Sequence, residues 1–211
     1  MSRMLAAVLG QSDVSRETRE RFDIHLALLR KWQRKINLVS ASTLDEAESR
    51  HIADSAALWR FAPQGVRRWL DLGSGAGFPG LVIAAIAAEK APGLTVTLIE
   101  SDLRKAAFLS TVIREAELPA QIIASRIEDV PPQSADVISA RALAPLSKLL
   151  AYAERHRAPG SVCLFHKGAR HESELTAALE SWNITHEALH HPGGGDSVIL
   201  KIEGFDRVRT A

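Results

Sequence analysis

One glycine-rich segment carries the residues best suited to hold a ligand. It reads Asp71-Leu-Gly-Ser-Gly-Ala-Gly-Phe-Pro-Gly80. Glycine is favoured where a side chain would block a tight turn or the approach of a ligand to the backbone. The segment lies between a strand-like run and a helix-like run, which is where parallel sheets bind ligands. A ligand site is therefore predicted here, and the identity of the ligand decides the function.

Three ligand classes use loops of this kind, and their spacing rules differ. A nucleoside triphosphate loop needs a lysine after its last glycine, and none follows here. A dinucleotide pattern, Gly-x-Gly-x-x-Gly, occurs at Gly75, Gly77 and Gly80, but it begins four residues after the strand-end acid Asp71. The other register places Asp71 two residues before Gly73, Gly75 and Gly77. An acid at this place suits a cationic sulfonium and would repel a diphosphate, so the pattern favours S-adenosylmethionine.

A second acid supports the same ligand. Glu100 ends the next strand-like run, where a carboxylate can accept hydrogen bonds from both ribose hydroxyls of an adenosine. In the alternative interpretation, Asp71 caps a turn and Glu100 is a solvated strand end. The ordered combination of glycines and acid favours the ligand.

Strand-like and helix-like runs alternate from residue 64 onwards, and these are the elements that must position the loop. The alternation predicts an α/β fold with a mostly parallel, seven-stranded sheet covered on both faces. The last two strands have no helix between them, which predicts a terminal antiparallel hairpin. Strands are predicted at 66–72, 94–99, 121–124, 135–139, 161–166, 184–189 and 197–202, and helices at 78–89, 104–116, 144–156 and 172–181.

Residues 1–63 are predicted to form an N-terminal helical extension, followed by a ligand-binding domain at 64–211. Apolar residues at helical spacing predict an amphipathic helix at 15–36, with Ser15 as its N-cap, and a second helix covers 44–61. The first helix ends in four cations, which complement the helix dipole and are also candidates to bind nucleic acid. They are Arg30, Lys31, Arg34 and Lys35.

Composition limits the function classes. The 211 residues carry a formal net charge of +1, so a strongly basic coat is excluded and any nucleic-acid contact must be local. Cys163, the single cysteine, lies in an apolar run and is expected to be an inert core thiol. The longest uncharged apolar stretch near the loop, Leu81–Ala88, is too short to span a bilayer. A cytoplasmic protein without membrane contact is expected.

Several collinear motifs resemble one family, the glucose-inhibited division protein B family of bacterial 16S rRNA guanine-N7 methyltransferases. The FPG ending of the glycine loop and the Ser139-Ala-Arg-Ala142 element are the specific parts. The resemblance spans roughly residues 30 to 170. Its further motifs are Asn37-Leu38, Arg50-His-Ile-Ala-Asp-Ser55, Glu100-Ser101 with Lys105 and Phe108-Leu109, Ser125-Arg-Ile-Glu128, and Lys167-Gly168.

The resemblance implies a class I Rossmann-like methyltransferase that uses S-adenosylmethionine and acts on 16S rRNA. By position, Gly73 and Phe78 would contact the cofactor, and Ile127 and Glu128 would meet its adenine edge. Arg141 would lie at the mouth of the active site, both as a cofactor contact and as a catalytic residue. Lys167 is the second expected catalytic residue. A monomer is expected, and naked RNA and the assembled small subunit both stay open as substrates.

Other interpretations of these residues stay open. Arg141 could pair with Asp136 or Glu128. His51 and Asp54 could suggest a metal site, but no third ligand is evident, so no metal is expected and a helix–loop hydrogen bond is favoured. A second cluster of candidate RNA contacts is Arg155, Arg157, Lys167 and Arg170, and His186, His190 and His191 are expected at the surface.

Three rival functions remain. The first is a class I methyltransferase that acts on a small molecule or a protein, which predicts no RNA binding. The second is a dinucleotide-binding regulator or oxidoreductase, which predicts affinity for NAD. The third is a non-catalytic RNA-binding module with a degenerate pocket, which the intact glycines and Glu100 argue against.

Overall fold

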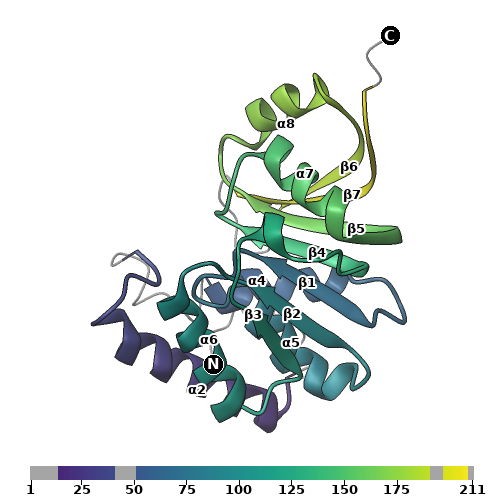
Figure 1. The fold of residues 1–211 in the computed structure, drawn as a ribbon. Coiled ribbons are helices and arrows are strands. Elements are labelled where there is room, and N and C mark those ends of the chain that lie inside the picture. Colours follow the sequence, from purple (N-terminus) through teal and green to yellow (C-terminus); the bar gives the residue numbers. More distant parts are fainter. Residues whose placement is uncertain (1–13, 41–50, 191–196, 209–211) are drawn as a thin grey trace.

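A computed structural model describes residues 14–40, 51–190 and 197–208, and its centre is a seven-stranded sheet (Figure 1). The strand order is β3-β2-β1-β4-β5-β7-β6. Strands β1 to β5 run parallel, whereas β7 is antiparallel to both β5 and β6. The predicted sheet and its terminal hairpin are thereby confirmed. The strands are β1 (Arg68–Leu72), β2 (Thr95–Ile99), β3 (Ala120–Ile123), β4 (Ala135–Arg141), β5 (Arg157–Lys167), β6 (Trp182–His190) and β7 (Val198–Arg207).

Helices cover both faces of the sheet because successive strand residues point to opposite sides. Along β5, Val162 and Leu164 face one hydrophobic cluster, whereas Cys163 and Phe165 face the other. The first cluster contains α2, α4, α5 and α6, and the second contains α7 and α8. The helices are α2 (Arg16–Gln33), α4 (Ala53–Ala57), α5 (Gly80–Lys90), α6 (Leu103–Glu115), α7 (Leu146–His156) and α8 (His171–Leu179), with 3-10 turns η2 (Leu58–Phe61) and η3 (Ile127–Asp129).

The N-terminal helix begins as predicted and ends earlier. The Ser15 hydroxyl accepts a hydrogen bond from the Thr18 amide at 3.0 Å, which caps α2. The helix ends at Gln33, whose side chain bonds the backbone of Leu38 and Val39. These contacts hold the chain in a loop where the sequence pattern predicted helix up to residue 36. Residues 44–50 of the second predicted helix lie outside the described part of the chain.

The described part of the predicted 1–63 extension is built onto the same core as the sheet. Phe22, Leu26 and Leu29 of α2 are buried in one cluster with the apolar residues of α5 and α6. Among the described residues, no helix combines the length and apolar character that crossing a bilayer requires. Cys163 is buried on β5, and burial raises the pKa of its thiol to about 12, as expected for an inert core thiol.

Candidate active site

A cavity of about 650 Å³ lies where the carboxyl ends of β1, β2, β3 and β4 meet. In a parallel sheet this edge is the usual place for a ligand. The wall includes the glycine loop, the first residues after β2 and β3, the end of β4 and two side chains of α7. Leu38, Val39 and Ser40, which follow α2, and His51, which precedes α4, line one side. The lining residues are Leu38, Val39, Ser40, His51, Gly73–Ala76, Phe78, Ile99–Ser101, Lys105, Ser125–Glu128, Arg141–Leu143, Lys148 and Tyr152.

The backbone of the glycine loop forms part of this wall directly. Gly73 and Gly75 have φ values of +62° and +54°, in the left-handed region that favours glycine. A Cβ at Gly73 would lie 2.5 Å from Leu143 Cδ1, so the residue is also required by close packing. Both glycines line the cavity, as their predicted role requires.

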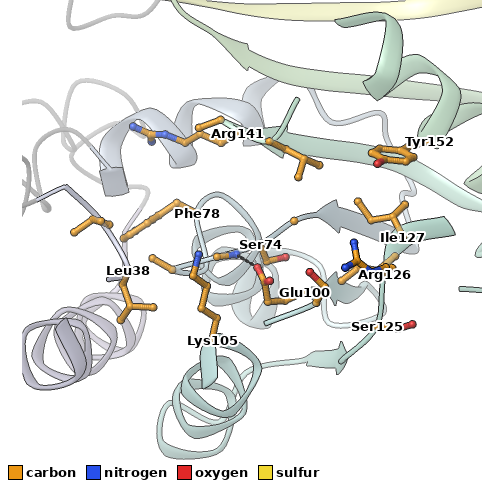
Figure 2. A pocket seen from close by; sticks show the side chains of 18 of the residues that line it. Leu38, Ser74, Phe78, Glu100, Lys105, Ser125, Arg126, Ile127, Arg141 and Tyr152 are labelled. Carbon is orange, nitrogen blue, oxygen red and sulfur yellow. Dashed lines mark hydrogen bonds between the residues drawn. The ribbon is translucent and has the colours of Figure 1, made fainter. Parts of the chain in front are cut away.

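Glu100 is held in place by two backbone amides. One carboxylate oxygen accepts from Gly75 N and the other from Asp102 N, each at 2.8 Å. Each carboxylate oxygen has a second lone pair, so the group can still accept two hydroxyl donors. Figure 2 shows Glu100 pointing into the middle of the cavity beside the glycine loop.

Asp71 does not line the cavity, and this corrects its predicted contact with the cofactor. Leu70 and Leu72 face the α7 side of the sheet, so strand alternation turns Asp71 toward the other face, where it packs against Gly80 at the start of α5. Its Oδ1 accepts a 2.7 Å hydrogen bond from the Ser139 hydroxyl. Burial raises the pKa of Asp71 to about 6. The carboxyl group therefore supports the glycine loop from the face of the sheet that packs against α5.

Gly77 also lies outside the cavity lining, although it belongs to the same motif. A Cβ there would collide with Leu81 and would lie 3.2 Å from Leu109. Its φ of +87° again requires glycine. Gly77 therefore lets the loop pack against α5 and α6, which places the other two glycines.

Phe78 lines the cavity, and its ring is stacked on His25 and tilted against His51. Its ring centroid lies 4.8 Å from that of His25 and 5.0 Å from that of His51. His25 Nε2 is 2.8 Å from the Ala76 carbonyl, which can only accept, so Nε2 carries the proton. Burial lowers the pKa of His25 to about 4. The neutral ring thus ties α2 to the glycine loop.

Arg141 lies at the end of β4 and lines the cavity, and its ion-pair partner differs from those considered. Its Nη2 is 3.5 Å from Asp54 Oδ2 on α4. Asp136 accepts instead from two backbone amides at the start of β1. Glu128 accepts a 2.8 Å hydrogen bond from the Tyr152 hydroxyl. The pair with Asp54 therefore differs from the two alternative pairings considered from the sequence.

Lys167 is buried away from the cavity, which corrects its expected position as a catalytic residue. Its side chain is 6% exposed and its Nζ donates to Glu174 Oε2 at 2.6 Å and to the Ala144 carbonyl at 2.9 Å. Its ammonium group is thus engaged with partners inside the protein, and Lys167 is not among the residues that line the cavity. Its contacts instead hold the chain that follows β4.

Two further cations of the second predicted RNA cluster are engaged within the protein. Arg155 Nε donates to the Val130 carbonyl at 3.1 Å. The Arg157 guanidinium lies 4.2 Å from the centroid of Phe205 and bonds Asp206. Lys167 is buried, and Arg170, the fourth member of this cluster, is exposed.

The cavity includes residues to which no role had been assigned. Lys105 and Arg126 belong to motifs that carry the family resemblance, so their position near Glu100 could have been expected. Lys148 and Tyr152 come from α7 and carry no motif signal. Figure 2 shows Tyr152 and Ile127 at one end of the cavity, and Leu38, Phe78 and Arg141 at the other, with Glu100 between them.

The remaining expectations concern histidines and metals. His186 and His190 are exposed on β6, as predicted, and His191 lies outside the described residues. Within the described ranges, no cluster of three or more His, Cys, Asp or Glu side chains is arranged to hold a metal ion.

The cavity fits an adenosine-containing ligand. The backbone of Gly73 forms part of its wall, and the Glu100 carboxylate is fixed by two backbone amides.

Comparison with known proteins agrees with this geometry. A family model described as GidB, rRNA small subunit methyltransferase G, matches residues 18–196. The ribosomal RNA small subunit methyltransferase G of Cereibacter sphaeroides is 50% identical over 205 residues, which cover 97% of this chain and 100% of the relative. The protein of the same name from Rhodospirillum centenum is 52% identical over 189 residues, covering 90% and 85%.

Solved structures share the fold at low sequence identity. A SAM-dependent methyltransferase from Aquifex aeolicus superposes with a TM-score of 0.57 and 14% identity, covering 79% of this chain and 100% of that chain. The structure of M. jannaschii TYW2 in complex with AdoMet gives a TM-score of 0.55 and 17% identity, covering 83% and 80%. The fold is thus the class I, Rossmann-like methyltransferase fold.

Proposed function

Because the chain belongs to the family of ribosomal RNA small subunit methyltransferase G, we propose that it methylates N7 of one guanine in 16S rRNA. The enzyme is a methyltransferase that uses S-adenosylmethionine. The observation that carries the proposal within this chain is the carboxylate of Glu100, fixed by two backbone amides in the wall of a glycine-lined cavity.

The proposed reaction needs no general base. N7 of guanine has an in-plane lone pair and carries no proton, so no proton has to be removed during transfer. S-adenosylmethionine supplies an electrophilic methyl group on its sulfonium. The protein must then align N7 with that methyl group, exclude water and provide a suitable electrostatic environment. None of these requirements depends on a catalytic dyad.

The lining residues divide along the cavity. Glu100, at the middle, would accept the two ribose hydroxyls with its remaining lone pairs. The end with Ile127 and Tyr152 would take the adenine, and the end with Phe78 and Arg141 would take the reacting groups (Figure 2). Arg141 would donate to guanine O6 or to a phosphate, because donation to N7 would occupy the lone pair that accepts the methyl group.

The RNA surface is proposed at the carboxyl end of α2. Arg30, Lys31, Arg34 and Lys35 are all exposed there. The chain continues from this basic end directly into Leu38, Val39 and Ser40, which line the cavity. Phosphates bound by these cations would therefore lie close to the reacting end, although the net charge of the whole protein is only +1.

The basic surface is small, so affinity for phosphates alone would be modest. This supports recognition of a folded RNA, because proteins recognise folded RNA largely by its shape and through its backbone. We infer that the substrate is rRNA arranged within the small subunit, that the enzyme acts as a monomer, and that it works in the cytoplasm with the ribosomal RNA. A class I methyltransferase acting on a small molecule or a protein is the rival function.

Methyl transfer with purified components tests the proposal. The protein is incubated with S-adenosylmethionine labelled in its methyl group and with unmethylated 16S rRNA, either naked or in small subunits, and the nucleosides are then separated. Label in 7-methylguanosine is the expected result, with stronger labelling of the subunits. Label in a different nucleoside contradicts the N7 assignment. Turnover with a small molecule or a protein and no labelled RNA favours the rival.

A further inference from the structure

The connection between β4 and α7, residues 142–145, forms one wall of the cavity and needs support from outside. Ala142 and Leu143 line the cavity. Ala142 has a φ of +52°, a left-handed conformation that is unfavourable for a residue other than glycine. Leu143 is the side chain that fills the space above Gly73. A shift of this connection would therefore alter the cavity at the glycine loop.

Helix α7, which follows the connection, lacks a cap of its own. Its N-cap position is Pro145, which provides no side-chain hydrogen bond. The amide of Leu146 would be an unsatisfied donor at the helix start. Glu174, from α8, accepts this amide at 3.0 Å. A carboxylate at this place also interacts favourably with the helix dipole.

Lys167 completes the arrangement from the end of β5. Its Nζ donates to the same Glu174 oxygen that caps α7, and it also donates to the carbonyl of Ala144 inside the connection. The Lys167 side chain is 6% exposed and that of Glu174 is 26% exposed. Removing one member of such a sheltered pair leaves the other charge poorly compensated. The two side chains thus hold the connection at two adjacent points, Ala144 and Leu146.

We propose that Lys167 and Glu174 are positioning residues that hold the 142–145 connection, and with it Leu143, in the conformation that binds the cofactor. The inference rests on the proposed function only in taking S-adenosylmethionine as the ligand. It assigns Lys167 a role at a distance in place of the direct catalytic role expected from sequence.

The test is the dissociation constant for S-adenosylmethionine, measured by calorimetry on the whole protein. Lys167→Met should raise this constant roughly tenfold or more, because the connection loses a bond to a charged group. Lys167→Arg should recover part of the affinity because it restores a cation. The matched control is Glu154→Gln, also on α7, which breaks a surface pair with Arg207 and should leave the affinity unchanged.

Thermal unfolding of the same variants separates positioning from general stability. If Lys167 has a merely structural role, Lys167→Met should have a lower melting temperature but wild-type affinity at temperatures where it is folded. That result would overturn the inference. If Lys167→Met does not fold, Glu174→Gln decides. The glutamine side chain can still accept a hydrogen bond from the Leu146 amide, but it no longer neutralises the charge of Lys167. Reduced affinity for S-adenosylmethionine is therefore expected, and unchanged affinity overturns the inference. Failure of the wild-type protein to bind would instead overturn the proposed function, and the inference with it.

Discussion

The guanidinium of Arg141 lies 3.5 Å from the carboxylate of Asp54, and this pair joins the end of β4 to α4 beside the cavity. Both side chains are about three-quarters buried, with 22% and 24% exposed. The pair restricts the directions in which Arg141 can donate to a substrate. Asp54 belongs to the Arg50–Ser55 motif, so the ion pair gives one residue of this motif a physical role at the site.

Replacement of Arg141 by alanine should leave the protein folded and remove most of its turnover. Asp54→Asn should cause a smaller loss, expressed mainly as a higher KM for RNA, because Arg141 is kept but less well oriented. Steady-state kinetics with circular dichroism as the folding check measures both effects. The matched control is Arg68→Ala, which breaks an exposed pair with Asp136. Full activity of Arg141→Ala would refute its role.

Glu100→Gln should weaken the binding of S-adenosylmethionine by roughly tenfold or more, since hydrogen bonds to a charged acceptor contribute about 1.5–3 kcal/mol. Glutamine has the same size but loses the charge and one acceptor, and its amide would face one of the two backbone donors. Calorimetric titration measures the affinity. Glu115→Gln, an exposed acid on α6, serves as the control, and equal affinities of both variants would speak against Glu100 as the ribose acceptor.

Gly73→Ala should reduce both stability and cofactor affinity, because the new Cβ would meet Leu143 at 2.5 Å in a left-handed backbone. A cost on the order of 1–3 kcal/mol in the free energy of unfolding is expected. Gly65→Ala is the matched control, since Gly65 also has a positive φ but nothing within 4 Å of a Cβ. Gly65→Ala should lower the free energy of unfolding and leave the cofactor affinity unchanged. Normal cofactor binding by Gly73→Ala would show that the close packing is not required.

Two buried groups beneath the glycine loop should have opposing effects on stability between pH 4 and pH 6. The pKa of His25 falls from 6.5 to about 4, mainly through burial, so the stability it contributes is present above pH 6.5 and is lost as the pH falls through 4. The pKa of Asp71 rises from 3.8 to about 6, also mainly through burial, so its contribution is present at low pH and is lost as the pH rises through 6. Each effect amounts to about 3 kcal/mol.

Urea unfolding across this pH range separates the two contributions. Relative to the wild-type protein, His25→Gln should lose about 3 kcal/mol in the free energy of unfolding as the pH rises from 4 to 6.5. Asp71→Asn should gain a similar amount relative to the wild-type protein between pH 4 and 6, which is the opposite sign. Curves that run parallel to that of the wild-type protein would mean that neither group has a shifted pKa.

The residues whose positions at the cavity follow from a local sequence pattern could be predicted from the sequence. Gly73, Gly75 and Glu100 follow strands that alternation identifies, and parallel strands bring their carboxyl ends together. Asp71 was placed on the wrong side of the loop, because proximity in sequence to the glycines hid the alternation that turns it toward α5. The position of Lys167 could not be predicted, since it depends on Glu174 and on the path of a connection more than twenty residues away. Tyr152 was missed for the same reason: α7 brings it to the cavity from a distant part of the chain.

The central claim, methylation of one guanine N7 in 16S rRNA, is tested most directly by mapping the modified nucleotides of ribosomal RNA from cells with and without the gene. The account predicts that one 7-methylguanosine disappears from small-subunit rRNA when the gene is deleted. The wild-type gene should restore it, and a gene encoding Gly73→Asp should not, because the new side chain would collide with Leu143 in the cavity wall. An unchanged set of modified nucleotides in the deletion strain would contradict the assignment of the substrate.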